Sequence, residues 1–177
     1  MRGILAGLTE SQRAEASKQA LGRLLQQESW RTARCVLFYA PIRNELDVWP
    51  LLNTALETGK LVSLPRFEAE TQTYIACRVK DPREDLKPGQ YGIPEPQAGC
   101  EPVALNQLDF ALVPGVAFDL QGRRLGQGRG YYDRLLAQMR GKTCGVAYDE
   151  QVVRAVPVQP HDSDVNCILT PTRWIEF

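Results

Sequence analysis

Residues 35–64 constrain the fold most strongly, because they combine a strand, a helix and a second strand within about thirty residues. The run from Cys35 to Ala40 is apolar, β-branched and aromatic without interruption, as in a strand that is covered on both faces. Asp47 is a good N-cap for the helix that follows, and Gly59 supplies a left-handed end. Residues 60–64 form the second strand. Such a unit requires a parallel strand pair with a right-handed crossover.

The rest of the chain repeats this alternation of helices and strands. Thr9 and Gln12 form a capping-box pattern at the start of a helix that we expect to extend to Glu28. The region from Arg66 to Pro102 reads mainly as loop and sheet edge, because proline and glycine are frequent there. We therefore predict an α/β fold, a three-layer sandwich with a mostly parallel central sheet and helices on both faces. Further strands are expected at residues 73–79, 110–113, 143–147 and 167–169, with a helix between Gly130 and Gly141.

Length and composition fit one soluble domain that spans residues 1–177. Lys plus Arg equal Asp plus Glu at 21 each, so bulk charge gives no support for a nucleic-acid or membrane partner. The longest apolar run is far shorter than the ~20 residues that span a bilayer. Five scattered cysteines without a C-x-x-C pair read as reduced thiols, with Cys35 and Cys144 in the core. We expect a cytoplasmic protein.

The segment from Arg123 to Arg134 carries the clearest chemical signal. Its three glycines at every second position bury no side chain, so core packing does not explain them. A glycine-rich loop that enters a helix exposes backbone N–H groups beside the positive end of the helix dipole, where phosphate binds. Four arginines, including Arg124 and Arg129, add fork-shaped donors for phosphate oxygens. We interpret the segment as an anion-binding loop rather than as a flexible loop with a solvated face.

Two familiar phosphate motifs do not fit this segment. A P-loop has four residues between its glycines and then Lys-Ser/Thr, which is absent. The dinucleotide fingerprint G-x-G-x-x-G follows a strand directly, whereas about a dozen loop residues precede Gly126 and the third glycine comes one position early. A dinucleotide-dependent oxidoreductase is therefore disfavoured.

The same residues closely resemble the 5-formyltetrahydrofolate cyclo-ligase family, also called 5,10-methenyltetrahydrofolate synthetase. The chain matches its pattern Val-Pro-Gly-x-Ala-Phe-Asp at residues 113–119 and then Arg-Leu-Gly-x-Gly-x-Gly-Tyr-Tyr-Asp-Arg at residues 124–134. Weaker similarity covers most of the chain in the right order. It includes Phe38-Tyr39-Ala40, Asn44-Glu45, Leu64-Pro65-Arg66, Gly92-Ile93-Pro94-Glu95-Pro96 and Ile168-Leu169-Thr170-Pro171.

The resemblance implies an ATP- and Mg²⁺-dependent enzyme of one-carbon metabolism that converts 5-formyltetrahydrofolate to 5,10-methenyltetrahydrofolate, releasing ADP and phosphate. The formyl oxygen is a poor leaving group, so the family is understood to phosphorylate it before N10 closes the ring. Phosphoryl transfer requires mainly positioning and charge neutralisation. This suits a chain that contains one histidine, His161, which we interpret as a solvated loop residue. We expect a monomer whose partners are 5-formyltetrahydrofolate and ATP.

The resemblance also implies roles for particular residues. Arg129 and Tyr131 are the expected catalytic residues, with Arg129 neutralising charge on the transferred phosphoryl group. Asp133 and Asp162 match the Mg²⁺ ligands, and we expect Asp133 to be exposed in the first turn of its helix. Read alone, Asp133 would be a carboxylate that stabilises a helix start, Asp162 a loop cap and Glu45 a solvated loop residue. The expected ATP-binding residues are Arg124, Leu125, Gly126, Gln127, Gly128, Arg129, Gly130, Tyr131 and Tyr132. The expected folate-binding residues are Glu45, Gln127, Gly128, Arg129, Gly130 and Tyr131.

One departure from the family pattern lies at the start of the chain. Relatives usually open with Lys-x-x-Leu-Arg, and the nearest match here runs from Arg2 to Ala6. Either the motif precedes residue 1, or other arginines such as Arg13 replace it, or nucleotide binds weakly. A homologue that binds nucleotide or folate without catalysis is therefore the alternative function. The intact glycine-rich segment and both aspartates argue against it.

Overall fold

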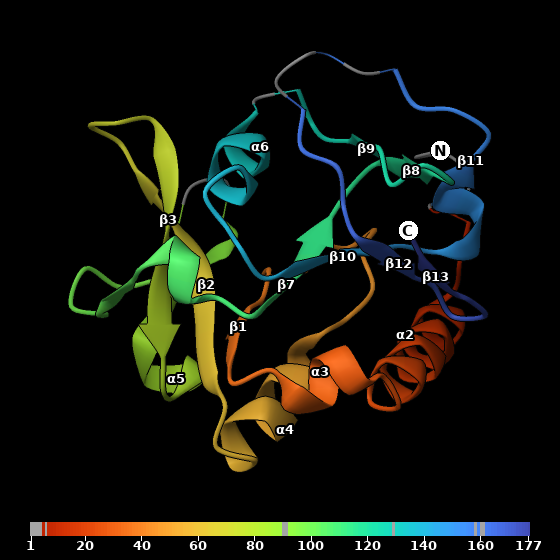
Figure 1. Ribbon diagram of the computed structural model, residues 1–177. Helices are drawn as coiled ribbons and strands as arrows, with labels where there is room; N and C mark the ends of the chain where they lie inside the picture. Colours follow the sequence, from red (N-terminus) through yellow and green to blue (C-terminus); the bar gives the residue numbers. More distant parts are fainter. Residues whose placement is uncertain (1–4, 6, 90–91, 129, 158, 160–161) are drawn as a thin grey trace.

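An eight-stranded mixed sheet forms the centre of the protein (Figure 1). The computed structural model describes residues 5, 7–89, 92–128, 130–157, 159 and 162–177. Five neighbouring strands, β12, β10, β7, β1 and β2, are parallel, and antiparallel strands extend the sheet at both edges. In spatial order the strands are β13 (Trp174–Glu176), β12 (Cys167–Leu169), β10 (Lys142–Val146), β7 (Phe110–Pro114), β1 (Cys35–Leu37), β2 (Leu61–Glu68), β3 (Thr73–Val79) and β6 (Pro102–Val103).

Helices cover both faces of this sheet, as predicted. On one face lie α2 (Glu10–Leu24), α3 (Glu28–Thr32) and α4 (Trp49–Glu57), and α6 (Tyr131–Leu136) lies on the other (Figure 1). Neighbouring strand residues alternate between the two cores: Val36 and Leu112 pack toward α2–α4, whereas Leu37 and Val113 pack toward α6. The continuous apolar run at Cys35 therefore reflects a strand that is buried on both faces. The prediction of a three-layer α/β fold is confirmed.

Several local predictions are also confirmed. The strands at Thr73–Val79 and Cys167–Leu169 have the expected bounds, and β1 and β2 form the parallel pair that the strand–helix–strand unit requires. The capping box of Thr9 with Gln12 is present, and Gly59 adopts a φ of 79° after α4.

Three helix boundaries differ from the prediction. α2 ends at Leu24, and a separate α3 places Trp30 edge-on against Phe38 and Phe110 in the core. A straight helix to Glu28 does not provide that turn. The N-cap of α4 is Val48 rather than Asp47, although the Asp47 carboxylate still accepts a hydrogen bond from the Trp49 N–H at 2.9 Å. α6 ends at Leu136, five residues before Gly141.

The two regions expected as loops contain short elements that the sequence pattern did not reveal. Between β3 and β6 lie α5 (Pro82–Asp85), β4 (Leu86–Pro88) and β5 (Pro94–Pro96). Between β7 and α6 lies the antiparallel pair β8 (Ala117–Asp119) and β9 (Arg124–Leu125), with β11 (Val152–Val153) beside β8. The described residues also include the 3₁₀ turns η2 (Leu105–Gln107) and η3 (Asp149–Gln151). Strands of two or three residues are too short for a period-2 pattern to identify.

Phe118 anchors the β8–β9 pair to the central sheet. Its ring is fully buried, and a Cβ added at Gly145 of β10 would lie 2.5 Å from it. We therefore expect Gly145→Ala to lower the free energy of unfolding by about 1–3 kcal/mol, the usual cost of overpacking. Urea unfolding checks this. Gly22→Ala is the control, since its added Cβ meets nothing within 4 Å and a helical alanine raises stability by about 0.5–1 kcal/mol. Equal stability of Gly145→Ala and the wild type would contradict the account.

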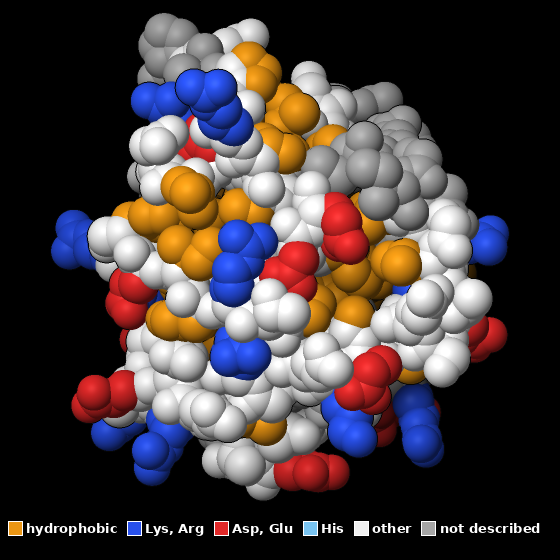
Figure 2. Space-filling model, turned by 90° about the vertical axis from the view of Figure 1, so that its right-hand side faces the viewer, with side chains coloured by type: hydrophobic (Ala, Val, Ile, Leu, Met, Phe, Trp, Pro, Cys, Tyr) orange, Lys and Arg blue, Asp and Glu red, His pale blue; other side chains and the backbone are white. Residues whose placement is uncertain are grey.

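Surface charge, helix length and the cysteines bear on three further predictions. On the face in Figure 2, Lys and Arg side chains alternate with Asp and Glu side chains around hydrophobic patches, so no field of one sign covers it. Within the described ranges no helix is long and apolar enough to cross a membrane. All five cysteines are free, and Cys35 and Cys144 are buried as expected.

Candidate functional site

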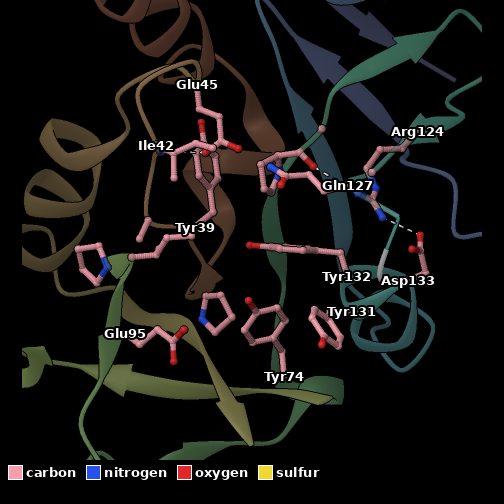
Figure 3. Close-up of a pocket in the computed structure, with 18 residues that line it drawn as sticks. Tyr39, Ile42, Glu45, Tyr74, Glu95, Arg124, Gln127, Tyr131, Tyr132 and Asp133 are labelled. Carbon is pink, nitrogen blue, oxygen red and sulfur yellow. Dashed lines mark hydrogen bonds and ion pairs between the residues drawn. The ribbon is translucent and has the colours of Figure 1, made fainter. Parts of the chain in front are cut away.

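A cavity of about 310 Å³ opens at the carboxyl ends of β1 and β7 (Figure 3). The chain leaves β1 for β2 on one side and later continues from β7 to β10 on the other, so this is the point where the strand order reverses. Open α/β sheets bind ligands at such a point. The cavity is lined by Tyr39, Ala40, Ile42, Glu45, Pro65, Tyr74, Ile93, Pro94, Glu95, Pro114, Gly115, Arg124, Gly126, Gln127, Gly130, Tyr131, Tyr132 and Asp133.

The glycine-rich segment forms one wall of the cavity. It leaves β9 at Leu125 and enters α6 at Gly130, which is the N-cap of that helix with a φ of 61°. Gly128 also has a positive φ, 86°, which a residue with a side chain rarely adopts. The glycines therefore meet a backbone requirement of this turn. Since α6 has six residues, the helix dipole is weaker than the sequence suggested.

A buried ion pair joins the two ends of this segment. The guanidinium of Arg124 donates to Asp133 Oδ1 at 2.6 Å, and the two side chains are 4% and 11% exposed. Arg124 also donates to the Pro114 carbonyl at 3.4 Å and lies over the Tyr132 ring, 5.8 Å from its centroid. Its Nε is buried and has no hydrogen-bond partner within the described part of the chain. This N–H is therefore a buried donor that the described residues leave unsatisfied.

The expectation that Asp133 is an exposed first-turn carboxylate is wrong. Asp133 is 9% exposed. The interior tolerates its carboxylate because the positive charge of Arg124 compensates it. The Ser163 N–H lies 3.4 Å from Asp133 Oδ1, and the Ser163 hydroxyl donates to the Asp133 carbonyl at 3.1 Å. Asp162 does not line the cavity, and its Oδ2 accepts a hydrogen bond from the Gln159 N–H at 2.7 Å. The two expected metal ligands thus belong to neighbouring segments, linked through Ser163.

Glu45 approaches the cavity from the loop after β1. Its Oε2 accepts a hydrogen bond from the Ile42 N–H at 3.0 Å, which orients the carboxylate. Burial raises the pKa of Glu45 to about 7, and the hydrogen bond from Ile42 opposes that shift. The loop is fixed from two sides, since Tyr39 donates to the Leu46 carbonyl at 2.8 Å and Tyr148 to the Glu45 carbonyl at 3.4 Å.

Aromatic rings form the floor between Glu45 and the glycine-rich segment (Figure 3). Tyr131 packs against Phe67 and Tyr74, with ring centroids 5.3 and 5.4 Å apart. Tyr132 lies 6.0 Å from Tyr74, and burial raises the pKa of its hydroxyl. Flat apolar walls with a carboxylate at one end suit a planar heterocycle that carries N–H donors.

Glu95 is a cavity residue that our sequence analysis did not assign a role. Its side chain comes from β5, its residue is 8% exposed, and its Oε2 accepts a hydrogen bond from the Phe67 N–H at 3.2 Å. Gly89 packs so closely on it that any added Cβ would overlap the Glu95 side chain. The available signal was the Gly-Ile-Pro-Glu-Pro motif, which the resemblance already included.

The structure brings most of the predicted site residues to one cavity. Glu45, Arg124, Gly126, Gln127, Gly130, Tyr131, Tyr132 and Asp133 line it. Leu125 and Gly128 belong to the same segment but do not line the cavity. Arg129, His161 and the Arg2–Ile4 stretch lie outside the described residues.

Arg13, which we considered as a replacement for the basic residues of the family's opening motif, does not line the cavity. It donates to the carbonyls of Leu5 and Arg43 at 2.9 and 2.5 Å, and Asn44 Oδ1 is 3.4 Å away. Arg13 thereby ties the start of the chain to the loop that carries Glu45. Its role in this structure is to hold that loop.

Known proteins match both the sequence and the fold. The family model described as the 5-formyltetrahydrofolate cyclo-ligase family matches residues 1–171. The protein named 5-formyltetrahydrofolate cyclo-ligase from Escherichia coli (strain K12) is 31% identical over 174 residues, which cover 96% of each chain. Its namesake from Haemophilus influenzae is 32% identical, over 92% of this chain and 89% of the relative.

Solved structures agree with this match. The NMR structure of Aquifex aeolicus 5,10-methenyltetrahydrofolate synthetase is 36% identical and superposes with a TM-score of 0.87, covering 99% of this chain and 89% of that one. The Mycoplasma pneumoniae structure, at 20% identity and a TM-score of 0.76, supports the fold alone. The sequence motifs, the cavity at the strand reversal and these matches lead to one conclusion: the chain belongs to the 5-formyltetrahydrofolate cyclo-ligase family.

Proposed function

We propose that this protein converts 5-formyltetrahydrofolate to 5,10-methenyltetrahydrofolate at the cost of ATP, releasing ADP and phosphate. The observation that carries the proposal is the juxtaposition of Glu45 and the glycine-rich segment across one cavity. Glu45 would accept hydrogen bonds from the pterin N–H groups, and the rings of Tyr74 and Tyr131 would flank the pterin. Gly126 and Gln127 would lie against the ATP phosphates, because glycine lets the backbone approach a ligand closely.

The reaction needs little from the protein beyond positioning. The formyl oxygen attacks the γ-phosphorus of ATP, and the bond to ADP breaks. N10 then attacks the activated carbon and loses its proton, and phosphate leaves with the former formyl oxygen. Developing charge on the phosphoryl group calls for fixed cationic donors. Arg124, which lines the cavity, and Arg129 are the residues we assign to this task.

We propose that a magnesium ion shared with nucleotide is held near α6. Among the described residues no group of three or more His, Cys, Asp or Glu side chains could hold a metal by itself. Mg²⁺ commonly takes one or two carboxylates and completes its shell with phosphate oxygens and water. Asp133 and Asp162 are the carboxylates that we propose would hold it. When bound, Mg²⁺ supplies charge neutralisation for the phosphate oxygens.

Purified protein is expected to form the methenyl product only when ATP and Mg²⁺ are both present. The conjugated methenyl cation absorbs in the near ultraviolet, so the product can be followed directly. Omission of ATP, or chelation of Mg²⁺, is the control and should abolish the signal. Tight binding of 5-formyltetrahydrofolate without turnover would instead favour a binding protein on the same fold.

A further inference from the structure

A second hollow adjoins the cavity at Pro94. It has a volume of about 380 Å³, and Pro94 borders both spaces. Its lining residues are Trp49, Pro82, Arg83, Leu86, Lys87, Pro88, Gly92 and Pro94. We call this hollow the side groove.

The side groove lies at the end of the cavity away from the nucleotide segment. Arg124 and Asp133 stand at one end of the cavity, whereas Glu95, the residue after Pro94, stands at the other (Figure 3). A ligand that fills the cavity between these ends, and that is longer than the cavity, can continue past Pro94. The groove therefore extends the folate side of the site.

The charges that line the side groove are both positive. Arg83 and Lys87 are exposed, and neither side chain forms an ion pair with any residue in the described ranges. The nearest carboxylates in sequence accept hydrogen bonds from backbone N–H groups instead. Asp81 accepts one from the Arg83 N–H at 2.9 Å, and Asp85 accepts one from the Lys80 N–H at 2.6 Å. Glu84, between them, is exposed and lines neither hollow.

Glu95 also leaves the charge of Lys87 available. The two residues are directly opposite in the β4–β5 pair, but the Glu95 carboxylate accepts a hydrogen bond from the Phe67 N–H at 3.2 Å and lines the cavity. No ion pair joins Glu95 to Lys87 in the described structure. The side groove thus combines apolar surface from Trp49 and prolines with two available cations.

We propose that the side groove binds the acidic tail of the folate substrate. This inference rests on the function proposed above, which places the pterin between Glu45 and the tyrosines. Beyond the pterin, a folate carries a flat benzoyl ring and then one or more glutamyl residues with free carboxylates. Trp49 and the prolines provide a surface for the ring, and Arg83 and Lys87 are cations for the carboxylates.

The double variant Arg83→Ala/Lys87→Ala tests the proposal. With 5-formyltetrahydrofolate that carries three glutamyl residues, we expect KM to rise about fivefold and kcat to stay unchanged, because exposed ion pairs are individually modest. With one glutamyl residue the rise should be smaller, and KM for ATP should not change. Raising the ionic strength should increase the triglutamate KM of the wild type more than that of the variant.

A matched control removes two cations elsewhere. Lys18 and Arg140 are exposed and form no hydrogen bond or ion pair through their side chains with described residues, so Lys18→Ala/Arg140→Ala should behave as wild type. Equal KM values for the groove variant and this control on the triglutamate substrate would overturn the proposal.

A binding experiment separates this inference from the proposed activity. The probe is p-aminobenzoyl-triglutamate, which lacks the pterin, and its affinity is measured by calorimetry. The wild type and the Lys18/Arg140 control should bind it more tightly than the Arg83/Lys87 variant. If the wild type fails to turn over but shows this difference, the activity is wrong and the groove assignment stands. Equal probe affinity in all three proteins refutes the groove.

Discussion

Asp133→Asn is expected to destabilise the fold and to abolish turnover together. The substitution leaves the Arg124 guanidinium buried beside a neutral amide, and breaking such a pair from one side costs about 3–5 kcal/mol. Turnover should fall by at least about a hundredfold, because charge at the phosphoryl group is a main determinant of its transfer. Urea unfolding and the methenyl absorbance assay measure the two effects.

A double variant distinguishes folding from chemistry. Arg124→Met/Asp133→Leu removes both charges at once, and apolar replacement of a buried pair is often neutral or stabilising. We expect this variant to recover most of the stability that Asp133→Asn loses, with no recovery of turnover. A double variant that is stable and active would show that the pair is structural only. Full stability of Asp133→Asn would show that Arg124 does not depend on its partner.

The fold was predictable where the sequence carries long periodic signals. Strand β3 and helix α4 have enough residues for an apolar pattern to emerge, and the strand–helix–strand unit fixed a parallel pair. The pair β8–β9 was not predicted, because its strands have three and two residues and depend on Phe118 packing against the main sheet. Such packing is a tertiary fact that periodicity does not encode.

The residues that form the site were predictable from the sequence, but their burial and their ion pairing were not. The motif identified both Arg124 and Asp133, but they lie nine positions apart in sequence, and nothing in their spacing predicts a 2.6 Å ion pair in the interior. Burial of Asp133 follows from where α6 packs. Glu95 was missed as a wall residue for the same reason, since its hydrogen bond to Phe67 joins strands 28 residues apart in sequence.

Glu45 is expected to reduce the stability of the free protein at neutral and higher pH. Its pKa rises from 4.5 in the unfolded chain to about 7 in the folded one, so the folded state binds more protons between these values. Stability from this group is therefore present at low pH and is lost as the pH rises toward 7. Glu45→Gln keeps an oxygen for the Ile42 N–H and removes the charge. Its unfolding free energy should exceed that of the wild type by about 1–3 kcal/mol at pH 8 and match it near pH 4.

The same substitution should weaken the enzyme by at least about a hundredfold in kcat/KM for 5-formyltetrahydrofolate, because a carboxylate that accepts two N–H donors contributes about 1.5–3 kcal/mol per bond. In the wild type the ionised form binds, so KM should rise by up to about tenfold per pH unit below pH 7 and level off above pH 8. The variant should lose this pH dependence while its KM for ATP is unchanged. Glu95→Gln, on the opposite wall, is the control and should keep the pH profile of KM. A variant that gains stability at pH 8 without losing folate affinity would show that Glu45 is an ordinary buried carboxyl group. A variant that loses both stability and folate affinity would show that the substitution acts by disturbing the loop that Tyr39 and Tyr148 hold.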